Sequence, residues 1–101
     1  MITINDKNYE FKYSIRSMFV WETIMEKPFE ITTLMDTYVF CYACIVSNPD
    51  NPELDFNTFI NACDEDPSII EKFNKFMNDE MKKRELLGKK KVMKKGKKES
   101  Q

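Results

Sequence analysis

The residue types that most often carry catalysis are either missing from this chain or placed where chemistry is disfavoured. Histidine is absent from all 101 residues, which removes Ser-His and Cys-His dyads, His-ligated metals and the usual general base. Both glycines, Gly88 and Gly96, come too late in the sequence to form a phosphate-binding loop. Glu22 and Glu26 are four residues apart, as expected for the solvated face of a helix. The sequence therefore predicts no enzyme, no catalytic residues, no cofactor and no metal site.

The three cysteines lie in apolar surroundings rather than in a reactive or metal-binding setting. Cys41 and Cys44 form a C-x-x-C spacing, but both sit inside the unbroken apolar run 38–46. A redox or zinc site would need polar flanks, nearby positive charge or a second pair of ligands. We interpret all three, including Cys63, as small buried hydrophobes with reduced thiols, the state expected in a cytoplasm.

The length and the apolar pattern predict one small domain, which we place at residues 1–88. Apolar residues make up 42% of the chain and charged residues 33%, enough for a core with a polar surface. No apolar run approaches the roughly 20 residues that a membrane-spanning helix needs, so we expect no membrane partner. The first residues, Met1 to Asn5, lack the basic and long apolar regions of an export signal, so we expect no export.

Charge divides the chain into an acidic body and a basic end. Residues 1–81 contain 6 Lys and Arg against 15 Asp and Glu, a balance of −9. Residues 82–101 contain 10 Lys and Arg against 2 Asp and Glu, a balance of +8. The Lys-rich stretch 89–101 is of low complexity and lacks apolar periodicity, so we predict that it is disordered.

Periodicity and capping residues predict an α+β fold that is mostly helical. Apolar residues that alternate on either side of Asn5-Asp6-Lys7-Asn8 indicate a β-hairpin over residues 1–13. A hairpin of this size is marginal alone, so it should pack on a bundle of about four helices. The helices are predicted at about 14–26, 33–47, 55–63 and 67–87. Their predicted caps are Ser14, Thr33 with Asp36, Asp55, and Asp66 with Pro67, and Gly88 is the predicted end of the last helix.

The second predicted helix is apolar around its whole circumference over residues 38–46. A single neighbouring helix could not cover such a surface. The helix is therefore either the centre of the core or an element that also faces another subunit. Because the apolar surface is large for so small a body, we expect self-association into a homo-oligomer.

Three sequence patterns follow one another in an order that resembles a known family. Residues 2–11 have the form Ile-x-Ile-Asn-x-Lys-x-Tyr-x-Phe and lead into an amphipathic helix. The apolar helix that follows has a Tyr-x-x-x-Tyr pattern, and residues 48–56 read Asn-Pro-x-Asn-Pro-Glu-Leu-Asp-Phe. In pattern and element order, residues 1–80 resemble the small tail assembly chaperones of long-tailed bacteriophages, which are encoded between the major tail protein and the tape measure protein.

This resemblance implies a non-enzymatic protein of the host cytoplasm that acts during tail morphogenesis. Such chaperones bind the tape measure protein, keep it soluble and help to recruit tail tube subunits, so both proteins are expected partners. A tape measure segment is expected to be a long amphipathic helix, which the apolar faces of residues 34–46 and 69–81 could hold. Aromatic side chains contribute a large share of interface energy. Our candidate partner-binding residues on these two helices are therefore Tyr38, Tyr42, Phe73 and Phe76.

Two other functions are left open by the residues themselves. A small nucleic-acid-associated phage protein could use the basic C-terminal tail to neutralise phosphates. The acidic body would repel a nucleic-acid backbone, however, so nucleic acid is not the partner that we expect. A homo-oligomeric structural or adaptor protein of the virion would instead use the apolar second helix for self-association.

Overall fold

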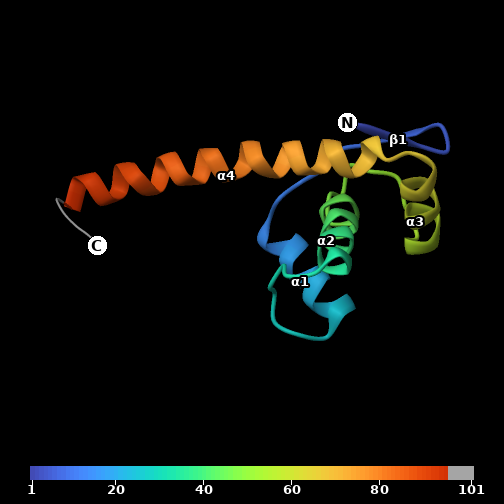
Figure 1. Ribbon diagram of the computed structural model, residues 1–101, viewed down its shortest axis with the longest axis horizontal. Helices are drawn as coiled ribbons and strands as arrows, with labels where there is room; N and C mark the ends of the chain where they lie inside the picture. The colour runs from blue at the N-terminus through green and yellow to red at the C-terminus, as the bar shows by residue number, and fades with distance from the viewer. Residues whose placement is uncertain (96–101) are drawn as a thin grey trace.

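The computed structural model describes the backbone of residues 1–95 and the side chains of residues 1–84. The elements in chain order are β1 (Ile2–Ile4), β2 (Lys7–Tyr9), α1 (Ile15–Met25), α2 (Leu34–Val46), α3 (Phe56–Glu65) and α4 (Ser68–Lys95). The predicted α+β class, with an N-terminal hairpin and four helices, is confirmed. The long helix α4 runs along one edge of the molecule, and α1, α2 and α3 lie on one side of it (Figure 1).

The hairpin has the turn that its sequence predicts. β1 and β2 pair antiparallel with Ile2 opposite Tyr9, and the turn between them consists of Asn5 and Asp6. These two residues have φ angles of 51° and 66°, in the left-handed region that asparagine and aspartate tolerate best among non-glycine residues. The alternation of β1 buries Ile2 and Ile4 on the face that packs against the helices.

The second strand is shorter than the predicted hairpin over residues 1–13, because β2 ends at Tyr9. Beyond it the backbone bonds to other partners. The Glu10 N–H donates to Asn51 Oδ1 at 2.9 Å, and the Lys12 N–H donates to the Cys44 carbonyl, near the C-terminal end of α2, at 3.0 Å. Carbonyls in the last turn of a helix lack a partner within the helix, so this bond satisfies one of them and ties residues 10–13 to α2.

The first three helices begin at the predicted caps. The Ser14 hydroxyl accepts the N–H of the residue three positions on, and Asp55 does the same for α3. Thr33 and Asp36 form a capping box at the start of α2, in which each side chain accepts the other residue's backbone N–H. These caps place the three helices within two residues of the predicted boundaries, because each one satisfies N–H groups that the first helical turn leaves unpaired.

The last helix differs from its predicted range. Asp66 accepts the Ser68 N–H at 3.0 Å, which is the bond expected of an N-cap with Pro67 in the first position. At the other end α4 continues through Gly88 to Lys95, so the helix extends past the predicted end at residue 87 and into the stretch that was predicted to be disordered. One glycine costs a helix only about 1 kcal/mol, and the lysines that follow are good helix formers. The remainder of the predicted disordered tail, residues 96–101, lies outside the described residues.

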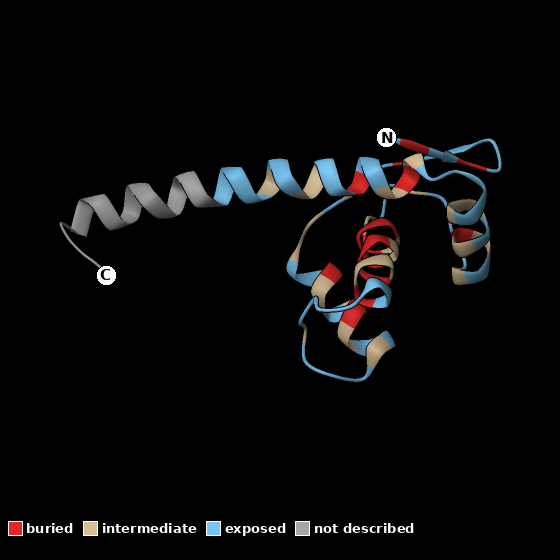
Figure 2. Ribbon diagram, viewed as in Figure 1, coloured by how far each residue is buried: buried red, intermediate tan, exposed pale blue. Residues whose placement is uncertain are grey.

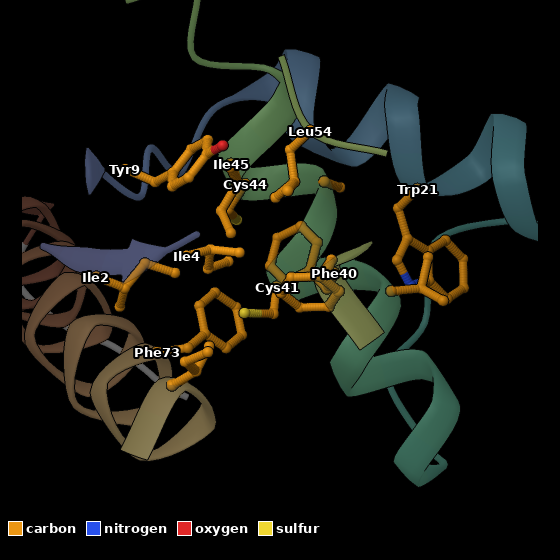
Figure 3. Packing of buried hydrophobic residues seen from close by; sticks show 14 residues of the cluster. Ile2, Ile4, Tyr9, Trp21, Phe40, Cys41, Cys44, Ile45, Leu54 and Phe73 are labelled. Carbon is orange, nitrogen blue, oxygen red and sulfur yellow. The ribbon is translucent and has the colours of Figure 1, made fainter. Parts of the chain in front are cut away.

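The helix α2 is the centre of the core. Its run 38–46 is buried or half-buried along its whole length (Figure 2), as expected for a helix that is apolar all round. Buried side chains from the hairpin, α1, α3 and α4 surround it (Figure 3). The largest fully buried side chains outside α2 are Ile2, Tyr9, Trp21, Phe59 and Ile69. The alternative that this run faces another subunit is therefore not needed to explain its composition.

Candidate partner-binding site

Tyr42, one of the four predicted partner-binding residues, is a structural anchor. Its hydroxyl donates to the Leu54 carbonyl at 2.7 Å, and its ring lies 5.2 Å from the Phe56 ring and 5.5 Å from the Phe59 ring. These contacts fasten the segment before α3, and α3 itself, to α2. The ring is half-buried, and its polar end is already paired within the chain.

Tyr38 lies one turn earlier on the same side of α2. It is half-buried, and burial, followed by the nearby thiol of Cys63, raises the pKa of its hydroxyl above the ordinary value. That proximity places Tyr38 beside the C-terminal part of α3. The two predicted tyrosines therefore face α3 together.

Phe73 and Phe76 lie on α4 and pack against a different element. The Phe11 ring is 5.2 Å from Phe73 and 5.4 Å from Phe76. Phe73 is buried and points toward Phe40 and Cys41 of α2 (Figure 3), whereas Phe76 is half-buried near the chain's first residues. The structure thus brings the four predicted residues together in two pairs, and the two pairs do not form one surface.

An apolar groove opens between α4, α2 and the segment that joins α1 to α2. Its volume is about 300 Å³. Ile31 at one edge is 41% exposed and Met81 at the other is 43% exposed, while Phe40 and Phe73 form part of the floor. The lining residues are Tyr13, Phe29, Ile31, Thr37, Phe40, Phe73, Asn74, Met77 and Met81. Of the four predicted residues, only Phe73 contributes to this groove.

The edge of the groove nearest α1 is held by Trp21 and Asp36. The indole Nε1–H of buried Trp21 donates to the Asp36 carbonyl at 3.0 Å, and the Trp21 ring meets Phe29 edge-on at 5.1 Å. The Phe29 N–H donates to the carboxylate of Glu22 at 2.7 Å. These contacts fix the start of the α1–α2 connection, where the Phe29 ring lies 4.8 Å from the Phe40 ring of α2.

The Asp36 side chain holds the exit of the same connection. Its Oδ2 accepts the N–H groups of Thr32 and Thr33 at 2.9 and 3.0 Å, and the Lys27 ammonium lies 3.5 Å from its Oδ1. The hydrogen bond from the Thr32 N–H is the largest cause that holds the pKa of Asp36 well below its usual range. A buried carboxylate without such donors would strongly destabilise the fold, so this network explains why an acidic residue lies inside an apolar helix.

The far end of the groove carries positive charge. The guanidinium carbon of Arg84 lies 4.5 Å from the centre of the Tyr13 ring, a distance typical of a cation–π contact. Lys82 and Lys83 are exposed on the same stretch of α4. A ligand in the groove would therefore meet apolar side chains along its length and cations at this end.

A separate set of exposed apolar residues lies away from the groove. Phe19 on α1 is 62% exposed and Leu34 at the start of α2 is 76% exposed, and neither lines the groove. Ile15 and Met35 are exposed as well. Single exposed apolar side chains are normal on protein surfaces, so these residues serve here as controls for the groove.

The thiols are not arranged for chemistry. Cys41 and Cys44 are buried and Cys63 is half-buried. Burial raises the pKa of Cys44 to about 12 and that of Cys63 to about 11, so the reactive thiolate is scarce at neutral pH. Among the residues whose side chains are described, no group of three cysteine or acidic side chains could hold a metal ion.

The comparisons with known proteins give no match. No protein-family model matches the chain, and neither does any curated protein or solved structure. Within the described part of the chain, no helix has both the length and the apolar character required to cross a membrane. The resemblance to phage tail assembly chaperones therefore stays a prediction.

Proposed function

We propose that this protein is a tail assembly chaperone that acts in the host cytoplasm of a long-tailed phage. In this proposal it binds the tape measure protein, keeps it soluble and helps to recruit tail tube subunits. The open apolar groove between α2, α4 and the α1–α2 connection is the observation that carries the proposal. The order of sequence patterns over residues 1–80 supports it independently.

The groove has the chemistry that an amphipathic helix requires. Helix-in-groove recognition places a row of apolar side chains, spaced three and four residues apart, into a matching hollow. Aromatic rings form the floor of this groove, and Met77 and Met81 lie along one side. Methionine side chains adapt to different shapes, which suits a protein that must hold several segments of one long helical partner.

Co-expression with the tape measure protein of the same genome tests the proposal. The wild-type chain should raise the soluble fraction of that protein. Ile31→Glu puts a negative charge at the exposed edge of the groove, and Asn74→Arg replaces a neutral amide in its lining with a larger, positively charged side chain. Each should reduce co-purification of the tape measure protein at least about tenfold, because a charge buried in an apolar contact costs more than about 1.4 kcal/mol.

Leu34→Glu is the matched control, because it introduces the same charge at a more exposed apolar residue outside the groove. The circular dichroism spectrum of each variant should match that of the wild type, which shows that folding is retained. If Leu34→Glu weakens co-purification as strongly as Ile31→Glu does, the groove is not the binding site. If the wild-type chain solubilises no tape measure segment, the chaperone proposal fails. Salt-sensitive DNA or RNA binding in a gel-shift assay would then favour the nucleic-acid alternative.

A further inference from the structure

Arg84 lies at the basic end of the groove, on the same face of α4 as the methionines of the groove. It follows Met77 by seven residues and Met81 by three, spacings that bring side chains to one face of a helix. Its guanidinium carbon lies 4.5 Å from the centre of the Tyr13 ring, and Tyr13 itself lines the groove. The cation is therefore placed at the end of the apolar lining and not on the outer face of α4.

The groove continues past Met81 towards Arg84. A second hollow, with a volume of about 550 Å³, is lined by Asn78, Met81, Lys82 and Arg84. Met81 lines both hollows, so the two adjoin along α4. From Phe73 to Met81 the lining spans about 12 Å at 1.5 Å per residue, and Arg84 lies about one helical turn further along. A bound helix would fill the apolar part with about two turns and would reach the guanidinium with its next turn.

The contact with Tyr13 orients the guanidinium and leaves its hydrogen-bond donors available. The five N–H groups of an arginine lie in the plane of the guanidinium and form a rigid fork. Among the side chains of residues 1–84, Arg84 has no acidic partner, because the ion pairs of α4 join Lys75 to Asp79 and Lys83 to Glu80. Arg84 is exposed. Its charge is thus held in one place and is open to a ligand in the groove.

We infer that Arg84 determines which helices the groove accepts, by pairing with an acidic side chain that follows the apolar row of the bound helix. This inference rests on the proposed function, since it concerns the helix that the groove holds. The bound segment carries apolar residues, spaced three and four apart, over about eight residues. An Asp or Glu then follows about one turn beyond one end of that row. Its carboxylate can accept two N–H bonds from the guanidinium at once.

Lys82 carries the same charge as Arg84 but cannot supply the same selectivity. It lies about 100° around the helix from Met81, whereas Arg84 shares the face of the groove. A lysine ammonium is a point charge on a flexible chain, without the planar fork that matches a carboxylate. Lys82 therefore attracts any acidic segment from a distance, whereas Arg84 requires a carboxylate at one position. A lysine at that position of the partner would be repelled.

Fluorescence anisotropy with the full chain and labelled synthetic peptides tests the inference. The probes are overlapping peptides that cover the tape measure protein of the same genome. Those that bind should share the apolar row followed by an acidic residue, and each is resynthesised with Gln or with Lys in place of that residue. The wild-type chain should bind the Gln version about tenfold more weakly, as expected for loss of a charge-assisted pair, and the Lys version more weakly still. Arg84→Gln should bind the original and the Gln version equally well.

Lys82→Gln is the matched control, because it removes the same charge from the neighbouring residue. It should keep the preference for the original peptide over the Gln version, whereas Arg84→Glu should instead prefer the Lys version. Both positions are exposed, and circular dichroism spectra equal to that of the wild type show that folding is retained.

The outcomes separate this inference from the proposed function. The role of Arg84 is overturned if Arg84→Gln keeps the preference, if Lys82→Gln abolishes it as completely, or if the peptides that bind lack the acidic residue. The groove itself still stands in these cases as long as Ile31→Glu weakens binding. If no peptide binds, or if Ile31→Glu leaves binding unchanged, the groove is not the binding site and both proposals fail.

Discussion

Trp21 joins three parts of the molecule, and its replacement by phenylalanine tests how one edge of the groove is held. The buried indole donates to the Asp36 carbonyl at 3.0 Å and meets Phe29 edge-on at 5.1 Å. Trp21→Phe keeps an aromatic ring in place but removes the donor and part of the ring volume. The variant therefore tests the hydrogen bond and the extra volume of the indole together, while an aromatic ring is kept at this position.

The expected loss follows from two contributions. The lost hydrogen bond should cost about 1 kcal/mol. A phenyl ring leaves a void of about 40 Å³ relative to an indole, which at about 24 cal/mol per Å³ costs about 1 kcal/mol more. The free energy of unfolding should fall by about 2 kcal/mol, and the melting temperature of a domain of this size by about 8–16 °C.

Urea unfolding followed by far-ultraviolet circular dichroism measures this change in both proteins. Trp21 is the single tryptophan of the chain, so fluorescence can follow the wild type but not the variant. Phe19→Leu on the same helix is the control, because Phe19 is largely exposed and its replacement should change stability by less than about 0.5 kcal/mol. A loss for Trp21→Phe no larger than that of the control would refute the assigned role of the indole.

Three further predictions concern Tyr42, Asp36 and the cysteines. Tyr42→Phe should lower the free energy of unfolding by about 1 kcal/mol, because it removes the 2.7 Å bond to the Leu54 carbonyl, and a urea midpoint equal to that of the wild type would contradict this. The folded-state pKa of Asp36 is depressed, so the stability that its carboxylate contributes is present above its unfolded-state pKa and is lost as the pH falls below about 5. Asp36→Asn should therefore be less stable than the wild type at neutral pH, and melting curves across the acid range should show a smaller loss in the variant than in the wild type. Because burial raises the pKa of Cys41 well above its ordinary value and that of half-buried Cys63 to about 11, alkylation of the folded chain should be slow and should label Cys63 first. Mass spectrometry of timed samples checks the order.

Local sequence patterns were sufficient to predict most of the elements, because their causes are local. The turn at Asn5 and Asp6 requires residues that tolerate positive φ, and the capping box of Thr33 with Asp36 spans four residues. Each of these features depends on chemistry within one turn of the chain. The end of α4 was mispredicted because a glycine is also tolerated within a helix when good helix formers follow it, so Gly88 alone does not decide the boundary.

The groove could not be predicted from periodicity, because its wall belongs in part to no regular element. Phe29 and Ile31 lie in the connection between α1 and α2, and Tyr13 lies before α1. The sequence did place apolar residues in this connection, since Phe29 and Ile31 lie between Trp21 and Asp36. Which of these side chains contact one another depends, however, on how α1 packs against α2. Helical spacing also did not predict which face of α1 is buried, because its apolar residues occupy more than one face. Only the packing of the helices determines that Trp21 is buried and Phe19 is exposed.

The core contacts of the predicted aromatic residues show why substitution at the groove edge is the better probe of function. A charge at Tyr42 or Phe73 would remove core contacts, and loss of binding would then follow from loss of folding. Ile31 contributes to the groove while much of its side chain stays in water, so a charge there changes the surface at little cost to the core. Leu34 has the same character outside the groove. If binding is lost at Ile31 and kept at Leu34, the loss is due to the groove itself, and the function is assigned to a surface rather than to the stability of the fold.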